Sequence, residues 1–227
     1  MKTVSVAIDG PSGAGKSTIA KTVAKRLGFT YIDTGAMYRT VALYALENGI
    51  DTKNADGALE QALAEIGIDI SYEDGSQHIF LNGRDVSEQI RTPQVSMGAS
   101  DVAAVPAVRL KLVELQRALA NRQNVIMDGR DIGTYVLPDA DIKIFLTADV
   151  EDRARRRYEE LVQKGNSVRF ADVLEDMKQR DKNDSARAFA PLCRAEDAEL
   201  IDTTGASLDE SVGRILSFIQ MRLSMLG

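Results

Sequence analysis

Short apolar runs alternate with segments of helical periodicity along the first quarter of the chain. The run VSVAI (4–8) is rich in Val and Ile, as buried strands of parallel sheets are, and FTYID (29–33) predicts a second strand. Apolar residues recur at helical spacing over 16–27, 36–48 and 55–66. This alternation of strands and helices predicts an α/β fold with a parallel sheet.

The pattern changes over residues 68–90, where short extended segments are separated by Asp74-Gly75 and Asn82-Gly83. Asp-Gly and Asn-Gly are strong hairpin signals, so we expect a small antiparallel insert here. The alternation then resumes. Strands are predicted over 124–128, 141–146 and 198–202, and helices over about 94–104, 107–121, 149–164, 170–187 and 208–225.

Charge and rare residues narrow the functional classes. The net charge of −6 argues against nucleic acid as the main partner, and no apolar run approaches the roughly 20 residues that cross a bilayer. Cys193 is the only cysteine, which favours a reducing, cytoplasmic compartment, and we expect it to be a small packing residue. His78 is the only histidine and is expected at the surface. A zinc cage of histidines and cysteines is therefore excluded.

The segment GPSGAGKS (10–17) fits the phosphate-binding pattern G-x-x-x-x-G-K-[ST], between an apolar strand and a helix. Glycines let backbone N–H groups surround phosphate oxygens at the positive end of the helix dipole. Lys16 would reach the β- and γ-phosphates, and the Ser17 hydroxyl would bind Mg²⁺. We expect a nucleoside triphosphate to be bound by Gly10, Pro11, Ser12, Gly13, Ala14, Gly15, Lys16, Ser17 and Thr18.

Other classes of P-loop protein fit less well than a kinase. A GTPase would need Asn-Lys-x-Asp, and the nearest string, DKND (181–184), has these letters in the wrong order. In the helix predicted over 170–187, Arg180, Asp184 and Arg187 continue the apolar stripe at i, i+4 and i+7. Charges on the core-facing side of a helix indicate a cleft.

The segment EDRARRRYEEL (151–161) leaves two interpretations open. Its charges form i,i+4 pairs, such as Asp152 with Arg156, that would stabilise any exposed helix. Arg153 and Arg157 also share one face and could instead bind phosphates.

An abundance of arginine suits a kinase whose acceptor is itself a phosphate monoester. Such an acceptor carries roughly −1.5 to −2 charges near neutral pH, so no general base is needed and repulsion between two polyanions is the obstacle. Arginine counters this repulsion because its planar guanidinium binds phosphate through two hydrogen bonds.

The segment IMDGRDI (126–132) places two carboxylates and a guanidinium directly after a predicted buried strand. It could hold a metal through Asp128, recognise a substrate, or be a solvated turn. The residues alone leave these three interpretations open. We reject the solvated turn only on the family resemblance given below, and a metal role for Asp128 stays open.

Five motifs carry a resemblance to bacterial cytidylate kinases, which phosphorylate CMP or dCMP with ATP. They are IDGPSGAGKST (8–18), DTGAMYR (33–39), ASDVAAVPAVR (99–109), DGRDIG (128–133) and RDKNDSARAFAPL (180–192). The resemblance implies a three-layer P-loop kinase fold, in which helices flank a central parallel sheet. It also implies a core of 1–34, 101–149 and 170–227, a monophosphate-binding segment of 35–100 with the insert, and a short lid of 150–169.

The resemblance also implies roles for individual residues. Arg39, Arg130 and Arg187 would hold the acceptor phosphate, with Thr34 and Tyr38 beside them. Ser100, Arg109 and Asp131 would bind cytosine, and Arg180 and Asp184 the pentose. Arg153 and Arg157 would clamp ATP. The residues expected to act in catalysis are Lys16, Arg130, Arg157 and Arg187.

The expected ligands are ATP with Mg²⁺, and CMP or dCMP, bound by a monomer without a nucleic-acid or membrane partner. Two alternatives stay open at this point. The acceptor could be UMP, AMP or dTMP, or the chain could be a P-loop switch without kinase activity.

Overall fold

The central sheet has five parallel strands in the order β2-β6-β1-β7-β8. The computed structural model describes residues 3–73 and 76–226. The strands are β1 (Ser5–Asp9), β2 (Thr30–Asp33), β6 (Val125–Gly129), β7 (Ile142–Thr147) and β8 (Glu199–Asp202). Each lies within two residues of its predicted range, so the predicted parallel sheet is confirmed.

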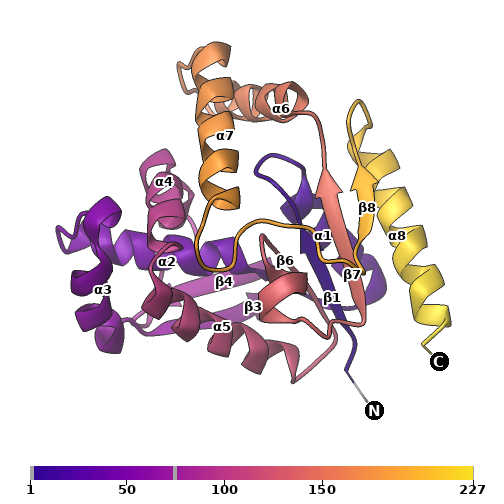
Figure 1. Cartoon of the computed structure of the whole chain (residues 1–227), viewed down its shortest axis with the longest axis horizontal. Coiled ribbons are helices and arrows are strands. Elements are labelled where there is room, and N and C mark those ends of the chain that lie inside the picture. The colour runs from indigo at the N-terminus through magenta and orange to yellow at the C-terminus, as the bar shows by residue number, and fades with distance from the viewer. Residues whose placement is uncertain (1–2, 74–75, 227) are drawn as a thin grey trace.

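Alternate residues of each strand face two different helical layers, because side chains of a strand point to opposite faces. On one face Val6 and Ile8 pack with Ile19 of α1 (Lys16–Leu27) and Ile215 of α8 (Leu208–Ser224). On the other face Ala7 packs in a cluster with Val113 of α5 (Pro106–Ala120). The sheet is thus the middle of three layers, as predicted (Figure 1).

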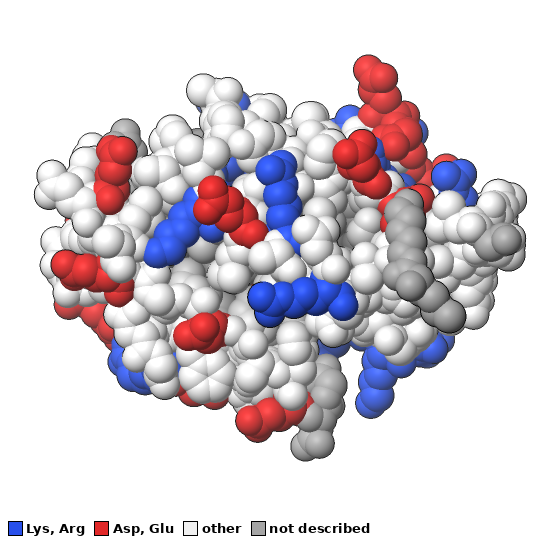
Figure 2. Space-filling view, turned by 90° about the horizontal axis from the view of Figure 1, so that it is seen from below, with Lys and Arg blue, Asp and Glu red and all other residues white. Residues whose placement is uncertain are grey.

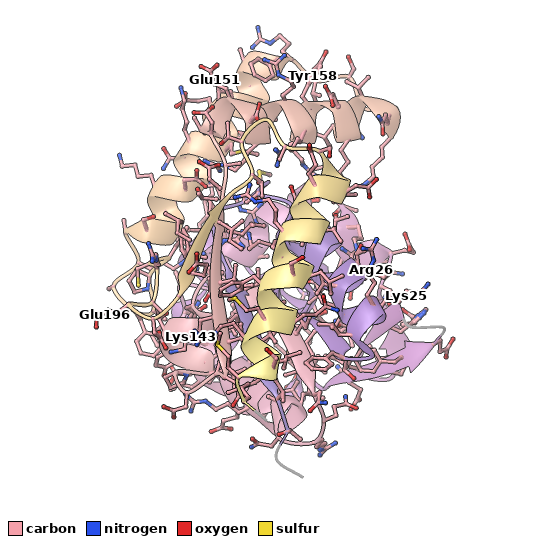
Figure 3. The ribbon with its side chains drawn as sticks, turned by 90° about the vertical axis from the view of Figure 1, so that its right-hand side faces the viewer. Lys25, Arg26, Lys143, Glu151, Tyr158 and Glu196 are labelled. Atoms are coloured by element: carbon pink, nitrogen blue, oxygen red, sulfur yellow. The ribbon has the colours of Figure 1, made fainter. Side chains whose placement is uncertain are left out.

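The first helical layer is seen from its outer side in Figure 3, where α8 lies in front with α1 beside it. Lys25 and Arg26 occupy the last turn of α1, where positive side chains interact favourably with the helix dipole. Gly28 then ends the helix in the left-handed conformation at φ 67°.

A second core lies beside the sheet, under the predicted monophosphate-binding segment. Residues such as Met37, Leu59, Ile79 and Leu112 pack there. The helices and 3₁₀ turns of this region are α2 (Thr34–Glu47), η1 (Thr52–Asn54), α3 (Asp56–Ala62), η2 (Leu63–Glu65), η3 (Gln89–Arg91) and α4 (Pro93–Val102). The single helix predicted over 55–66 is therefore divided into α3 and η2.

The antiparallel insert consists of β3 (Ile68–Glu73), β4 (Ser76–Leu81) and β5 (Arg84–Asp85). Asn82 and Gly83 both have positive φ, 50° and 80°, as a two-residue hairpin turn requires. The Asp74-Gly75 turn lies outside the described residues. The last strand pairs over two residues only, because the chain then turns toward η3.

Gln77 of β4 fastens the insert to the end of β2. Its Oε1 accepts the backbone N–H of Asp33 at 2.9 Å, and its Nε2 donates to the Asp33 carbonyl at 3.5 Å. The insert therefore meets the core at the predicted boundary between the core and the monophosphate-binding segment.

Two helices, α6 (Val150–Gln163) and α7 (Phe170–Ser185), stand above the end of the sheet where β1 enters the glycine loop (Figure 1). Tyr158 of α6 meets Phe170 edge-on, with ring centroids 6.0 Å apart (Figure 3). The helix predicted over 170–187 ends two residues early, so Arg187 lies beyond α7. Its guanidinium nevertheless pairs with Asp184.

Several further features differ from expectation or were not predicted. Cys193 is exposed and fills no core position, because its loop runs over the surface. A π-helical turn, η4 (Ile132–Val136), follows the DGRD segment. Figure 2 shows Lys, Arg, Asp and Glu scattered over one face, with no continuous basic stretch in the part not drawn grey. Among the described helices, none has the length and apolar character needed to cross a membrane.

Candidate active site

A cavity of about 680 Å³ opens beside the carboxyl ends of β1, β2 and β6. Crevices at this end of parallel strands are the usual ligand sites of open α/β sheets. Predicted site residues that line it are Ser12, Gly13, Gly15, Lys16, Ser17, Thr18, Thr34, Tyr38, Arg39, Ser100, Arg109, Arg130, Asp131, Arg157, Arg180, Asp184 and Arg187. Gly10, Pro11, Ala14 and Arg153 are not among the lining residues.

The glycine loop is shaped by close approaches that exclude side chains. Gly10 has φ 148°, and a Cβ there would lie 1.9 Å from the Leu146 carbonyl oxygen. Gly13 has φ 74°, in the left-handed region that favours glycine, and a Cβ there would lie 3.1 Å from Arg153 Cβ. No described side chain caps the first turn of α1, so its N–H groups are available to an anion.

Lys16 is buried at the start of α1, and its ammonium donates to the Pro11 carbonyl at 2.6 Å across the loop. Burial lowers the pKa of Lys16 and the Arg130 charge lowers it further, while the carboxylates of Asp128 and Asp9 oppose this shift. The lysine is thus held at the cavity wall among charges of both signs.

Asp128 ends a buried strand and is 5% exposed, so it does not lie on a solvated turn. Its carboxylate accepts the Ser17 hydroxyl at 2.8 Å and the Tyr31 hydroxyl at 2.9 Å. Burial raises the pKa of Asp128, and the nearby Asp33 charge raises it further. The sequence analysis did not single out Tyr31.

Arginines converge on two carboxylates that line the cavity. Asp184 accepts Arg130 Nε at 2.8 Å, and it also pairs with Arg187 and accepts the Ser100 hydroxyl. Burial acts to raise the pKa of Asp184, but the Arg130 and Arg187 charges hold it below its ordinary value. Arg180, half-buried, lines the same wall, so the predicted charged face of α7 does point into the cleft.

The second carboxylate is Asp33, which pairs with Arg39 at 2.9 Å and lies 3.6 Å from Arg91. Both Asp33 and Arg91 line the cavity and were missed by the sequence analysis. Asp33 could have been suspected because it ends the predicted strand over 29–33, and ligand sites of parallel sheets lie at the carboxyl ends of strands. Arg91 lies in a short 3₁₀ turn, where no periodicity marks it.

Two of the lining residues, Arg109 and Asp131, form a buried ion pair. Arg109 also donates to the Ala103 carbonyl at 3.0 Å, and its guanidinium lies 5.5 Å from the Tyr38 ring centroid. Burial raises the pKa of Tyr38 to about 12, whereas the Arg109 charge lowers it. The Tyr38 hydroxyl, Arg109 Nε and both amide atoms of Gln116 are buried without a hydrogen-bond partner among the described residues.

The two arginines predicted to clamp ATP have different surroundings. Arg153 is buried, donates to the Ser12 and Ala148 carbonyls at 2.9 and 2.8 Å, and pairs with Asp181 at 2.7 Å. It therefore connects the glycine loop to α6 and α7. Arg157 lines the cavity and pairs with Glu160 at 2.8 Å.

Arg156, which we considered only as part of a surface pair, also lines the cavity. It donates to the Thr203 carbonyl at 2.8 Å, and the expected contact with Asp152 is present at 3.6 Å. The i,i+4 pattern therefore does not exclude a place in the cavity, and only the orientation of α6 identifies this arginine.

All the site residues described above fall within the part of the chain that matches one known family. The family model described as cytidylate kinase matches residues 6–221. The chain belongs to the cytidylate kinase family. Curated relatives agree along nearly the whole chain. Cytidylate kinase of Caldicellulosiruptor bescii is 52% identical over 216 residues, covering 95% of each chain. Cytidylate kinase of Bacillus cereus is 49% identical over 218 residues, covering 96% of each.

Solved structures with little sequence similarity share the fold. An uncharacterised protein from Eubacterium ventriosum has a TM-score of 0.54 at 14% identity, over 96% of this chain and 99% of that one. A putative kinase from Chloroflexus aurantiacus has a TM-score of 0.50 at 12% identity, over 98% and 99%. At such identities the similarity concerns the fold alone.

Proposed function

We propose that this chain transfers the γ-phosphoryl group of ATP to CMP or dCMP, giving ADP and CDP or dCDP. The observation that carries the proposal is the buried Arg109–Asp131 pair, because it lines the same cavity as the glycine loop. The family to which the chain belongs supports the same reaction.

Arg39, Arg130 and Arg187 would hold the acceptor phosphate. Their partners, Asp33 and Asp184, keep the guanidiniums oriented without neutralising the whole cluster. Because the acceptor phosphate is already anionic, its oxygen can attack without a general base. The arginines would offset the repulsion between acceptor and ATP and align the two for transfer.

At the donor end, Lys16 and the glycine loop would bind the ATP phosphates, and Arg157 would reach them when the lid closes. For Arg157 this requires release from Glu160, an exchange of a partly exposed ion pair that costs little. We propose that Arg153 acts on ATP indirectly, by holding the Ser12 backbone.

The residues beside the donor phosphates suit Mg²⁺. Ser17 and Asp128 offer oxygen ligands, which this ion prefers, together with phosphates and water. The described residues contain no cluster of three or more His, Cys, Asp or Glu side chains for a metal, so the nucleotide would complete the coordination. When bound, Mg²⁺ would offset the negative charge of the ATP phosphates.

At the base end, Asp131 would accept the cytosine amino group, as carboxylates do when they recognise this base. Arg109 and Ser100 would complete base recognition, with Thr34 and Tyr38 lining the pocket. Arg180 and Asp184 would contact the pentose.

Water must be kept from the γ-phosphate, so segments 35–100 and 150–169 would close over the substrates against a core of 1–34, 101–149 and 170–227. Gln77 would connect the first of these segments to the core at Asp33. A cytoplasmic monomer with no nucleic-acid or membrane partner stays our expectation.

A coupled assay of ADP release tests the reaction. Purified chain with ATP and Mg²⁺ is given CMP, dCMP, UMP, AMP or dTMP in turn. We expect CMP and dCMP to have the highest kcat/KM. Preference for another monophosphate would mean that the chain is a nucleoside monophosphate kinase with that acceptor instead of CMP or dCMP. Binding of ATP without turnover of any acceptor would favour a switch.

A further inference from the structure

Asp9 is the last residue of β1 and directly precedes the glycine loop. It is 4% exposed, and its two carboxylate oxygens accept the backbone N–H groups of Ile132 at 2.8 Å and Gly133 at 2.7 Å. These amides belong to the turn that follows Arg130 and Asp131. One side chain thus joins the ATP-binding strand to the segment that faces the acceptor.

The sheet register explains why Asp9 can reach this turn. In the parallel pairing of β1 with β6, Asp9 lies beside Gly129, where the chain leaves the sheet. A Cβ on Gly133 would touch Asp9 Oδ2 at 3.4 Å and approach Lys143 Cδ closely, at 3.1 Å, so the turn packs directly against both side chains. The turn is closed further on, where the Asp131 carbonyl accepts the N–H groups of Tyr135 and Val136 at 2.9 and 3.0 Å.

Each half of the site is also held by contacts that do not involve Asp9. Asp131 pairs with Arg109, Arg130 with Asp184, and the Lys16 ammonium with the Pro11 carbonyl. Removing Asp9 would leave these contacts in place. What it would remove is the connection between the end of β1 and the turn at Ile132 and Gly133, while the hydrogen bond from Ser17 to Asp128 would remain.

We propose that Asp9 is a positioning residue that sets the acceptor-facing Arg130–Asp131 segment relative to the P-loop, and thereby aligns the two phosphates for transfer. The proposal rests on the proposed phosphoryl transfer. Asp9 itself is not among the residues that line the cavity, so it acts through the turn. Small misalignments of reacting groups cost large factors in rate.

The charge state of Asp9 sets the assay conditions. Burial raises the pKa of Asp9 to about 7; the Gly133 and Ile132 amides and the Lys16 charge oppose the shift, and the Asp131 charge adds to it. Assays at about pH 8 therefore measure the ionised carboxylate with both hydrogen bonds.

The test compares Asp9→Asn and Asp9→Ala with a matched control, Asp141→Asn. Asp141 also accepts a backbone amide of β1, that of Ser5 at 2.9 Å, but at the opposite end of the strand. Asn at position 9 keeps one acceptor oxygen and turns an NH₂ group toward the second amide, whereas Ala loses both bonds. One lost hydrogen bond in the aligned complex corresponds to about tenfold in rate.

We expect kcat to fall about tenfold in Asp9→Asn and about a hundredfold in Asp9→Ala. The KM values for ATP and CMP, and the affinity for each ligand alone by calorimetry, should stay within about threefold. Asp141→Asn should keep its kcat even if it unfolds at lower temperature. If Asp9→Ala does not fold, the kcat of Asp9→Asn alone tests the proposal.

An unchanged kcat in Asp9→Asn would overturn the proposal, and so would a loss confined to the KM or the affinity of one substrate. Wild-type protein is assayed in parallel. If it does not phosphorylate CMP or dCMP, the proposed function fails; if it does and Asp9→Asn matches it, only the role of Asp9 fails.

Discussion

The replacement Asp131→Asn addresses base recognition most directly. Asp131 and Arg109 form a buried pair whose side chains are 6% and 1% exposed. Removing the carboxylate as Ala would leave a buried guanidinium without its partner and lower the free energy of unfolding by about 3–5 kcal/mol. Asn is the better probe because it keeps the shape of the side chain and one oxygen that can accept from Arg109.

The expected magnitude follows from hydrogen bonding to the base. Cytosine carries an amino donor where uracil carries a carbonyl acceptor, so a carboxylate favours cytosine. With the Asn oxygen turned toward Arg109, its NH₂ group would face the base and oppose the cytosine amino group. A buried polar group left unpaired costs about 1–3 kcal/mol, or roughly one to two powers of ten in kcat/KM.

The assay measures kcat/KM for CMP and for UMP with wild type and variant at saturating ATP and Mg²⁺. We expect the ratio of CMP to UMP to fall about 10- to 100-fold. The KM for ATP should be unchanged, because ATP would be bound by the glycine loop and Lys16, whereas Asp131 pairs with Arg109. Thermal unfolding of both proteins controls for stability. An unchanged ratio in a folded variant would refute the role of Asp131 in base recognition.

Two further replacements test the remaining parts of the site. Tyr31→Phe removes a hydrogen bond that orients Asp128. We expect about three- to tenfold more Mg²⁺ to be needed for half-maximal activity, with the KM for CMP unchanged. A Mg²⁺ titration identical to that of wild type would exclude a role of Tyr31 in orienting Asp128. Gln77→Leu releases the insert from Asp33, so the KM for CMP should rise several-fold and that for ATP should not. X-ray scattering should show that the wild-type protein becomes more compact when both substrates are bound. If it does, and the KM for CMP of Gln77→Leu is nevertheless unchanged, the proposed role of Gln77 is wrong.

Local sequence predicted most elements because each carries its own periodic signal. The Val/Ile runs, the helical stripes and the Asn82-Gly83 turn depend on local backbone preferences, and the strands lie within two residues of their predicted ranges. The glycine loop could be predicted for the same reason. Its function follows from consecutive backbone N–H groups and one lysine. Arg187 was predicted on the correct side of the cleft but on a helix that ends before it.

Which side chains meet was decided only by the tertiary structure. Asp9 and Gly133 are more than a hundred residues apart in the sequence, and only the pairing of β1 with β6 brings them together. Arg153 and Arg156 carry the same charge on the same helix, yet Arg153 connects the glycine loop to α7 and Arg156 lines the cavity. The sequence by itself determined the chemical groups and the local elements that carry them. Their partners depend on strand order and helix orientation, which arise from contacts between distant parts of the chain.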